Sequence, residues 1–152
     1  MPNLNYEQFS NGQTLSNLNS TGEVSTNQWD LEEQNGTTRA DDQITGGVMV
    51  TILSAPAQAT IAGTEGLEIQ VRTAAAGALT SLYEIVGAIS VLPSKVVAGA
   101  QFWVPIYMDI AQTKLGCWFK AISTSFVGDI VVDADFLDAP VCKNEALQKI
   151  HS

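Results

Sequence analysis

Between residues 67 and 72, apolar and polar side chains alternate without exception, in the order Leu-Glu-Ile-Gln-Val-Arg. Successive side chains of a β-strand point to opposite faces of the sheet. We therefore expect Leu67, Ile69 and Val71 to face a core and the three polar side chains to face water. The segment predicts a strand of an antiparallel sheet with one buried face.

Other segments with strand-like patterns lie on both sides of this one, separated by Gly, Pro, Ser and Asp residues. They are residues 48–53, 82–91 with an expected bulge at Gly87, 102–106, 115–120 and 130–135. Pro105 has no backbone donor, which favours an edge or a bulge for its strand. No long helical pattern intervenes, and hydrophobic residues make up 45% of the 152, enough for one core. The sequence predicts an all-β protein, an antiparallel β-sandwich of the jelly-roll-like kind.

The N-terminal part of the chain has a different composition. Ser, Thr, Asn and Gln account for 22 of residues 1–45, a stretch too polar to bury much apolar surface. Single apolar residues recur in it and are candidate interface anchors: Leu4, Tyr6, Phe9, Leu15, Leu18 and Trp29. We expect an extended arm over residues 1–23, a sandwich over 24–140 and a C-terminal tail over 141–152. The arm either lies across a partner or wraps its own domain, with residues 24–31 as a first strand.

The charge and the reactive residues exclude several classes of function. Seven basic against 16 acidic residues give a net charge of −9, which repels nucleic acid and anionic membranes. The N-terminus lacks the layout of a signal peptide, so we expect synthesis in a cytoplasm. The only histidine is His151, the two cysteines are far apart, and no phosphate-binding loop is present. We therefore expect no enzyme, no cofactor and no metal, with Asp133, Asp135 and Asp138 forming a solvated strand face.

Two tryptophans are candidate surface residues. Trp103 and Trp118 are opposite in parity to the expected core residues of their strands, so both are expected on an outer face. An exposed tryptophan pair more often marks a protein interface than a sugar-stacking site. Both interpretations stay open at this point.

The order of several short motifs resembles the small capsid cement (decoration) proteins of tailed bacteriophages. The motifs, spread over residues 20–138, are 24–26, 29–31, 67–73, Leu92 with 98–100, Pro105, 115–116, 127–130 and 135–138. The resemblance implies a jelly-roll-like sandwich on the outer capsid surface of a virion, which bridges neighbouring major capsid proteins and stabilises the shell. It also implies a structural protein that contacts its own copies, as a dimer or a trimer. The alternative is a carbohydrate-binding or host-recognition module that stacks sugars on Trp103 and Trp118.

Overall fold

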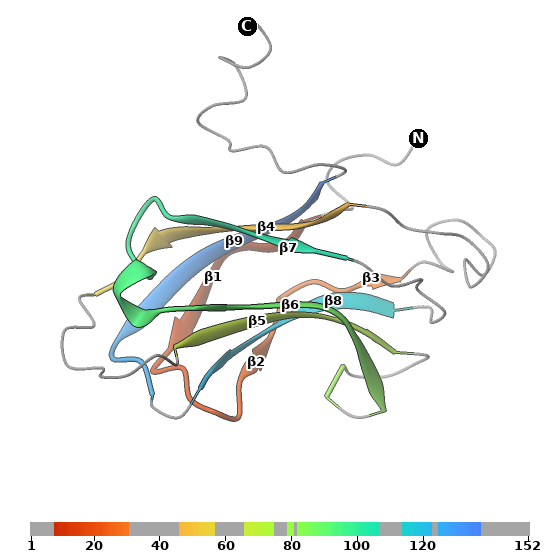
Figure 1. Cartoon of the computed structure of the whole chain (residues 1–152), viewed down its shortest axis with the longest axis horizontal. Helices are drawn as coiled ribbons and strands as arrows, with labels where there is room; N and C mark the ends of the chain where they lie inside the picture. Colours follow the sequence, from red (N-terminus) through yellow and green to blue (C-terminus); the bar gives the residue numbers. More distant parts are fainter. Residues whose placement is uncertain are drawn as a thin grey trace, which may run out of the picture.

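Two packed antiparallel β-sheets make up the described part of the protein in a computed structural model (Figure 1). The described residues are 8–30, 46–56, 66–74, 79–80, 82–106, 114–122 and 125–137, without the side chains of Trp29 and Asp30. The predicted all-β sandwich is therefore confirmed. Leu4, Tyr6, Asp138 and residues 141–152 lie outside the described residues, so the expectations for them stay predictions.

Each sheet is built from strands that are distant in sequence. Sheet A has the strand order β1-β9-β4-β7, and sheet B has the order β2-β8-β5-β6 with β3 also paired to β8. The strands of sheet A are β1 (Gln8–Ser16), β9 (Asp129–Leu137), β4 (Gly47–Ser54) and β7 (Gln101–Pro105). Those of sheet B are β2 (Glu23–Val24), β3 (Trp29–Asp30), β8 (Lys114–Ala121), β5 (Leu67–Ala74) and β6 (Tyr83–Val91). A short 3-10 helix, η2 (Pro93–Lys95), follows β6.

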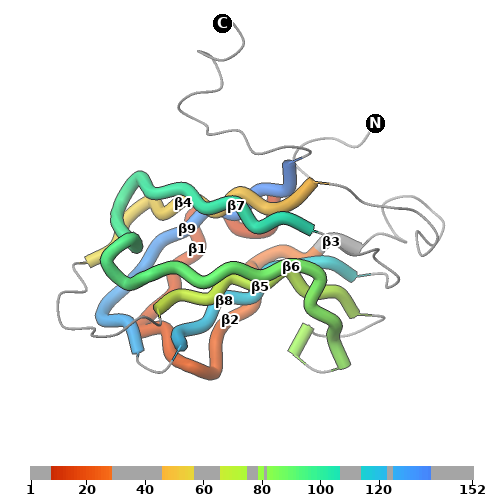
Figure 2. Tube along the Cα trace, in the orientation of Figure 1, coloured from red at the N-terminus to blue at the C-terminus, as the bar shows by residue number. Residues whose placement is uncertain are grey.

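The order of pairing defines a jelly roll. The first strand pairs with the last, β1 with β9, and moving inward along the chain β2 and β3 pair with β8, β4 with β7, and β5 with β6. Such nested antiparallel pairs describe one long hairpin that is folded over into two sheets. The tube in Figure 2 shows the chain passing back and forth between the layers. Pro105 ends β7 at the edge of sheet A, as predicted.

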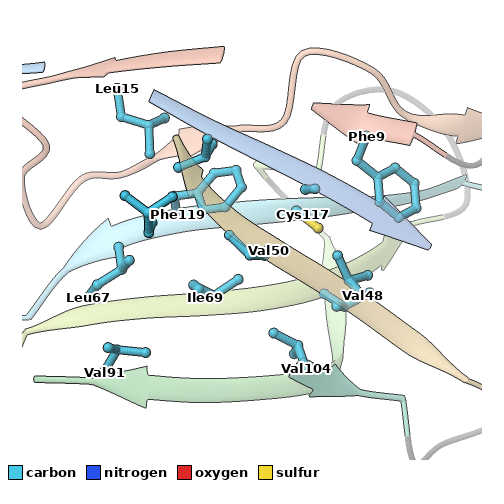
Figure 3. Close-up of a cluster of buried hydrophobic side chains, with 14 of the residues drawn as sticks. Phe9, Leu15, Val48, Val50, Leu67, Ile69, Val91, Val104, Cys117 and Phe119 are labelled. Carbon is cyan, nitrogen blue, oxygen red and sulfur yellow. The ribbon is translucent and has the colours of Figure 1, made fainter. Parts of the chain in front are cut away.

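The core lies between the sheets and follows the period of two. In β5, Leu67, Ile69 and Val71 are fully buried and face inward, as their alternation predicts. They meet side chains from both sheets, including Val50 of β4 and Phe119 of β8, in one continuous cluster (Figure 3). Burial of each such side chain contributes about 1.5–3 kcal/mol, so this cluster is the main source of stability.

The N-terminal segment is part of the sandwich, which corrects the expected boundary at residue 24. Strand β1 pairs with β9 from Gln8 opposite Asp135 to Ser16 opposite Asp129. Phe9, Leu15 and Leu18, which we expected as partner anchors, are 1%, 0% and 1% exposed in the protein's own core. Of the two open interpretations, the described part of the arm follows the one in which it wraps its own domain.

Strand β1 was not predicted from the sequence because its composition is polar. Its pairing with β9 shifts register twice, between Gln8 and Ser10 and between Ser10 and Gln13, so apolar side chains do not alternate along it. Gln13 is satisfied by hydrogen bonds instead of water. It accepts from Ser10 Oγ at 2.6 Å and from Thr26 N at 2.9 Å, and its amide donates to Val24 O at 2.8 Å. The side chain thus ties β1 of sheet A to the β2 region of sheet B.

Candidate interaction surfaces

The two tryptophans expected to form a surface pair lie on different sheets. Trp103 is on β7 of sheet A, where it is opposite Met49 and half-buried. Trp118 is on β8 of sheet B, where it is opposite Gln70, and only 7% of it is exposed. Trp118 faces outward from the core as expected, but it is covered. The sugar-stacking platform that the sequence allowed is therefore not formed by this pair.

Arg72 is the residue that covers Trp118. Its guanidinium carbon lies 4.1 Å from the centroid of the Trp118 ring and 3.7 Å from the centroid of the Tyr83 ring. Its Nε donates to Gln70 Oε1 at 2.7 Å, and an Nη donates to Leu79 O at 3.0 Å. A guanidinium between two aromatic rings with two directed hydrogen bonds is held in one position.

The burial of Gln70 and Arg72 corrects the expectation that both face water. They are 3% and 5% exposed, although they point away from the core as their parity requires. The reason is that Leu79, in the connection from β5 to β6, and Tyr83, at the start of β6, lie over the outside of sheet B against Arg72. Leu79 in that connection is fully buried, and a side chain at Gly116 of β8 would meet Leu79 Cδ1 at 2.5 Å. Loss of hydration lowers the pKa of Arg72, while attraction to Tyr83 and Glu68 opposes this shift.

The Trp118 indole is closed off on its other side by the β1–β2 loop. A Cβ at Gly22 would collide with Trp118 Nε1 and would lie 2.8 Å from Phe119 O. Trp118 Nε1 is buried and has no hydrogen-bond partner. Because Gly22 also has a φ of +85°, only glycine fits this position without strain. The indole therefore serves as packing between the loop and Arg72.

Exposed apolar side chains lie at the entry to β6; we call them the β5–β6 tip and define it as Leu82, just before the strand, with Tyr83 and Ile85 in it. They are 95%, 37% and 38% exposed. Leu82 has a φ of +51°, a left-handed conformation that costs a bulky residue about 1–2 kcal/mol. At Val86 the strand bulges, because Val71 pairs with Gly87 while Arg72 pairs with Ile85. In Figure 1 the start of β6 bends away from the rest of sheet B at the lower right.

The opposite end of the sandwich carries a second set of exposed aliphatic side chains, which we call the apolar end. Its members come from the end of β4, the β6–β7 connection and the β8–β9 connection: Leu53, Leu92, Val97 and Val127, which are 45%, 43%, 52% and 57% exposed. These segments are fastened together. Ile52 exchanges backbone hydrogen bonds with Gly99 and Ala100, at 2.7 and 2.8 Å. A side chain at Gly128, next to Val127, would touch Pro56 Cγ at 2.8 Å.

The tip and the apolar end are separated by the length of β6. The strand starts at Tyr83 in the tip and finishes at Val91, next to Leu92 of the apolar end. Nine residues of strand span roughly 27 Å. Sequence reasoning missed both sets, because isolated apolar residues in connections are ordinary and only their exposure distinguishes them.

The acidic and sulfur side chains do not assemble a reactive site in the described ranges. Asp133 Oδ1 accepts a hydrogen bond from Gly12 N at 2.8 Å, and Asp129 Oδ1 accepts from Ser16 Oγ at 2.8 Å, so both support β1. Burial raises the pKa of the Cys117 thiol far above its ordinary value. Among the described residues, no group of three or more His, Cys, Asp or Glu side chains is placed to hold a metal ion.

Comparisons with known proteins do not assign the chain to a family. No protein-family model matches the chain, and no curated protein matches its sequence. Within the described residues, no helix is long and apolar enough to span a membrane.

Proposed function

We propose that this protein is a structural component of a virion, a capsid cement protein that binds the outside of a tailed-phage head and bridges neighbouring major capsid proteins. The observation that carries the proposal is the pair of apolar surfaces at opposite ends of one sandwich. A bridging protein needs at least two contact regions that face different subunits, and the tip and the apolar end supply them. The motif resemblance described above supplies the identity of the partner.

The proposed attachment does not use the arm residues Phe9, Leu15 and Leu18, which is one of the two interpretations that the sequence left open. Phe9, Leu15 and Leu18 are core residues, so they are not available to fill hollows on a partner. The contact side chains are instead those presented by the connections at the two ends. Their exposed area on an acidic domain is suited to burial against another protein, where each fully buried aliphatic side chain contributes about 1.5–3 kcal/mol.

Copies of the protein would also meet on the shell, because neighbouring attachment points on a capsid lattice are close together. A net charge of −9 on each copy opposes association in free solution. Simultaneous weak contacts to several capsid subunits raise the effective concentration at each site, so a copy remains bound although no single contact is strong. The acidic surface is consistent with a position outside the shell, away from the packaged genome.

Co-sedimentation with empty shells tests the proposal. The shells are assembled from the major capsid protein encoded with this chain, and an equal mass of shells from an unrelated phage serves as the control. We expect saturable binding to the first shells alone, weakened in the double variant Leu53→Ser, Val97→Ser, whose exposed positions tolerate the change. Absence of saturable binding, or equal binding to both kinds of shell, would overturn the proposal.

A further inference from the structure

Leu82 combines two properties that a folded protein rarely gives to the same residue. Its side chain is 95% exposed, and its backbone has a φ of +51°. An exposed leucine gains nothing for the fold, and a left-handed conformation at a bulky residue is strained. Glycine or asparagine would relieve the strain at no cost in packing, because the side chain packs against almost nothing. Backbone strain of this kind gathers at positions that bind ligands or partners.

The surroundings of Leu82 hold it in place. Tyr83, the next residue, stacks on Arg72, and the same guanidinium donates to Leu79 O, three residues before Leu82. Leu79 is fully buried against Gly116 on the outside of sheet B. The chain is therefore anchored on both sides of the exposed leucine. A backbone that is already held in its bound conformation loses little conformational entropy when Leu82 enters a partner, which favours binding.

We propose that the β5–β6 tip is a recognition element, in which Leu82 inserts into an apolar socket with a basic rim on the major capsid protein. This inference rests on the proposed function and assigns the partner contact to one residue. The basic rim follows from charge: Glu84, between Tyr83 and Ile85 in the tip, is exposed, and the whole chain carries a net charge of −9.

The same observations argue against a second copy of this chain as the occupant of the contact. Two acidic copies repel each other, and two Glu84 side chains would approach in a symmetric contact of tip with tip. The hollow lined by the β1–β2 loop is polar, with Ser16, Asn17, Asn19, Thr21 and Glu23 in its wall. Leu18 also lines it but is 1% exposed, so the hollow presents a leucine side chain mainly with polar groups.

The test compares Leu82→Asn with the unmodified chain in binding to purified empty shells of the major capsid protein. Asparagine adopts left-handed conformations readily, so this variant should fold normally and melt at the same or a higher temperature. Gly12→Asn is the matched control, because it places an asparagine at another exposed position with positive φ, +66°, where an added Cβ would have no atom within 4 Å. We expect Leu82→Asn to raise the Kd about ten- to a hundredfold and Gly12→Asn to leave it unchanged.

A second variant, Arg72→Lys, separates insertion from positioning. Lysine keeps the charge but loses the planar stacking and the two directed hydrogen bonds. We expect weaker shell binding together with faster hydrogen exchange in the β5–β6 connection, while exchange in β4 and β9 stays unchanged. Normal exchange in the connection would show that Arg72 does not position the tip.

The outcomes distinguish this inference from the proposed function. Shell binding by the unmodified chain with an unchanged Kd for Leu82→Asn would refute the recognition tip and leave the cement function standing. No shell binding by the unmodified chain would refute both. A self-association in sedimentation equilibrium that Leu82→Asn abolishes would also overturn the inference, because the occupant would then be a second copy.

Discussion

The guanidinium carbon of Arg72 lies 4.1 Å from the centroid of the Trp118 ring, on the outside of sheet B. Both residues point away from the core, yet they are only 5% and 7% exposed. Their contact forms a small second layer of packing, which Leu79 of the β5–β6 connection and Tyr83 of β6 complete. This layer fastens the tip to the sandwich and removes Trp118 from the surface.

Replacement of Arg72 should therefore cost much more stability than its place on an outer face indicates. We expect Arg72→Ala to lower the free energy of unfolding by about 2–4 kcal/mol, since it removes two charged hydrogen bonds and the stacking. Lys120→Ala is the control, because Lys120 makes a half-exposed ion pair with Glu68 at 3.6 Å, worth about 0–1 kcal/mol. Denaturant titration followed by tryptophan fluorescence measures both. Equal losses of unfolding free energy in Arg72→Ala and Lys120→Ala would contradict the described packing.

The glycines of β1 and of the β1–β2 loop offer a test of the Trp118 environment. Gly12 and Gly22 both have positive φ, +66° and +85°, but a side chain at Gly12 meets nothing while one at Gly22 collides with Trp118 Nε1. We expect Gly12→Ala to cost about 1–2 kcal/mol from the backbone alone. Gly22→Ala should cost a further 1–3 kcal/mol or so, because the loop must move off the indole. Thermal melts of the two variants would argue against this arrangement if their midpoints coincided.

The sequence made Phe9 a candidate anchor for a partner, whereas the structure places it in the core, and a substitution distinguishes the two roles. Because Phe9 is only 1% exposed, we expect Phe9→Ala to lower the free energy of unfolding by about 3–5 kcal/mol. Thr14→Ala, at an exposed position of the same strand, should cost less than about 1 kcal/mol. Deletion of residues 1–16 should prevent stable folding, since β9 would lose one of its two partner strands and the core would lose Phe9 and Leu15. If the deletion variant kept the circular dichroism spectrum and the melting temperature of the full chain, residues 1–16 would be an arm that the fold does not need.

Burial makes Cys117 a reporter of unfolding. Its thiol is fully buried and its pKa is raised by the loss of hydration, so the reactive thiolate is scarce in the native state. In a Cys142→Ser background, we expect Ellman's reagent to label Cys117 only at the rate of unfolding, with little increase between pH 7 and pH 9. In urea above the transition, labelling should be fast and should follow pH as a free thiol does. Rapid labelling of the native protein would show that the core around Cys117 is open.

The core strands were accessible to sequence reasoning because their environment is periodic. Leu67, Ile69 and Val71 alternate with polar residues and face the core, and Pro105 marks the edge strand that the structure has. The same reasoning placed Arg72 in water, because alternation reports which side of a sheet a residue faces and not whether another segment covers that side. The β5–β6 connection that covers it has no pattern of its own.

Strand β1 was missed for a different physical reason. Two register shifts place Phe9 and Leu15 in the core without apolar residues at the intervening inward positions, and Gln13 satisfies its polar groups through hydrogen bonds. Composition alone then resembles that of a mobile arm. The exposure of Leu82 could not be predicted from the sequence either, because it depends on how the neighbouring residues are placed in three dimensions.

Electron cryomicroscopy of the shells, reconstructed with and without the protein, tests the central claim most directly. We expect a regular array of additional density on the outer surface, into which the jelly-roll sandwich fits with the tip on one capsid subunit and the apolar end on another. Shells that look the same in both reconstructions after incubation at saturating protein would contradict the account, as would density confined to the inner surface.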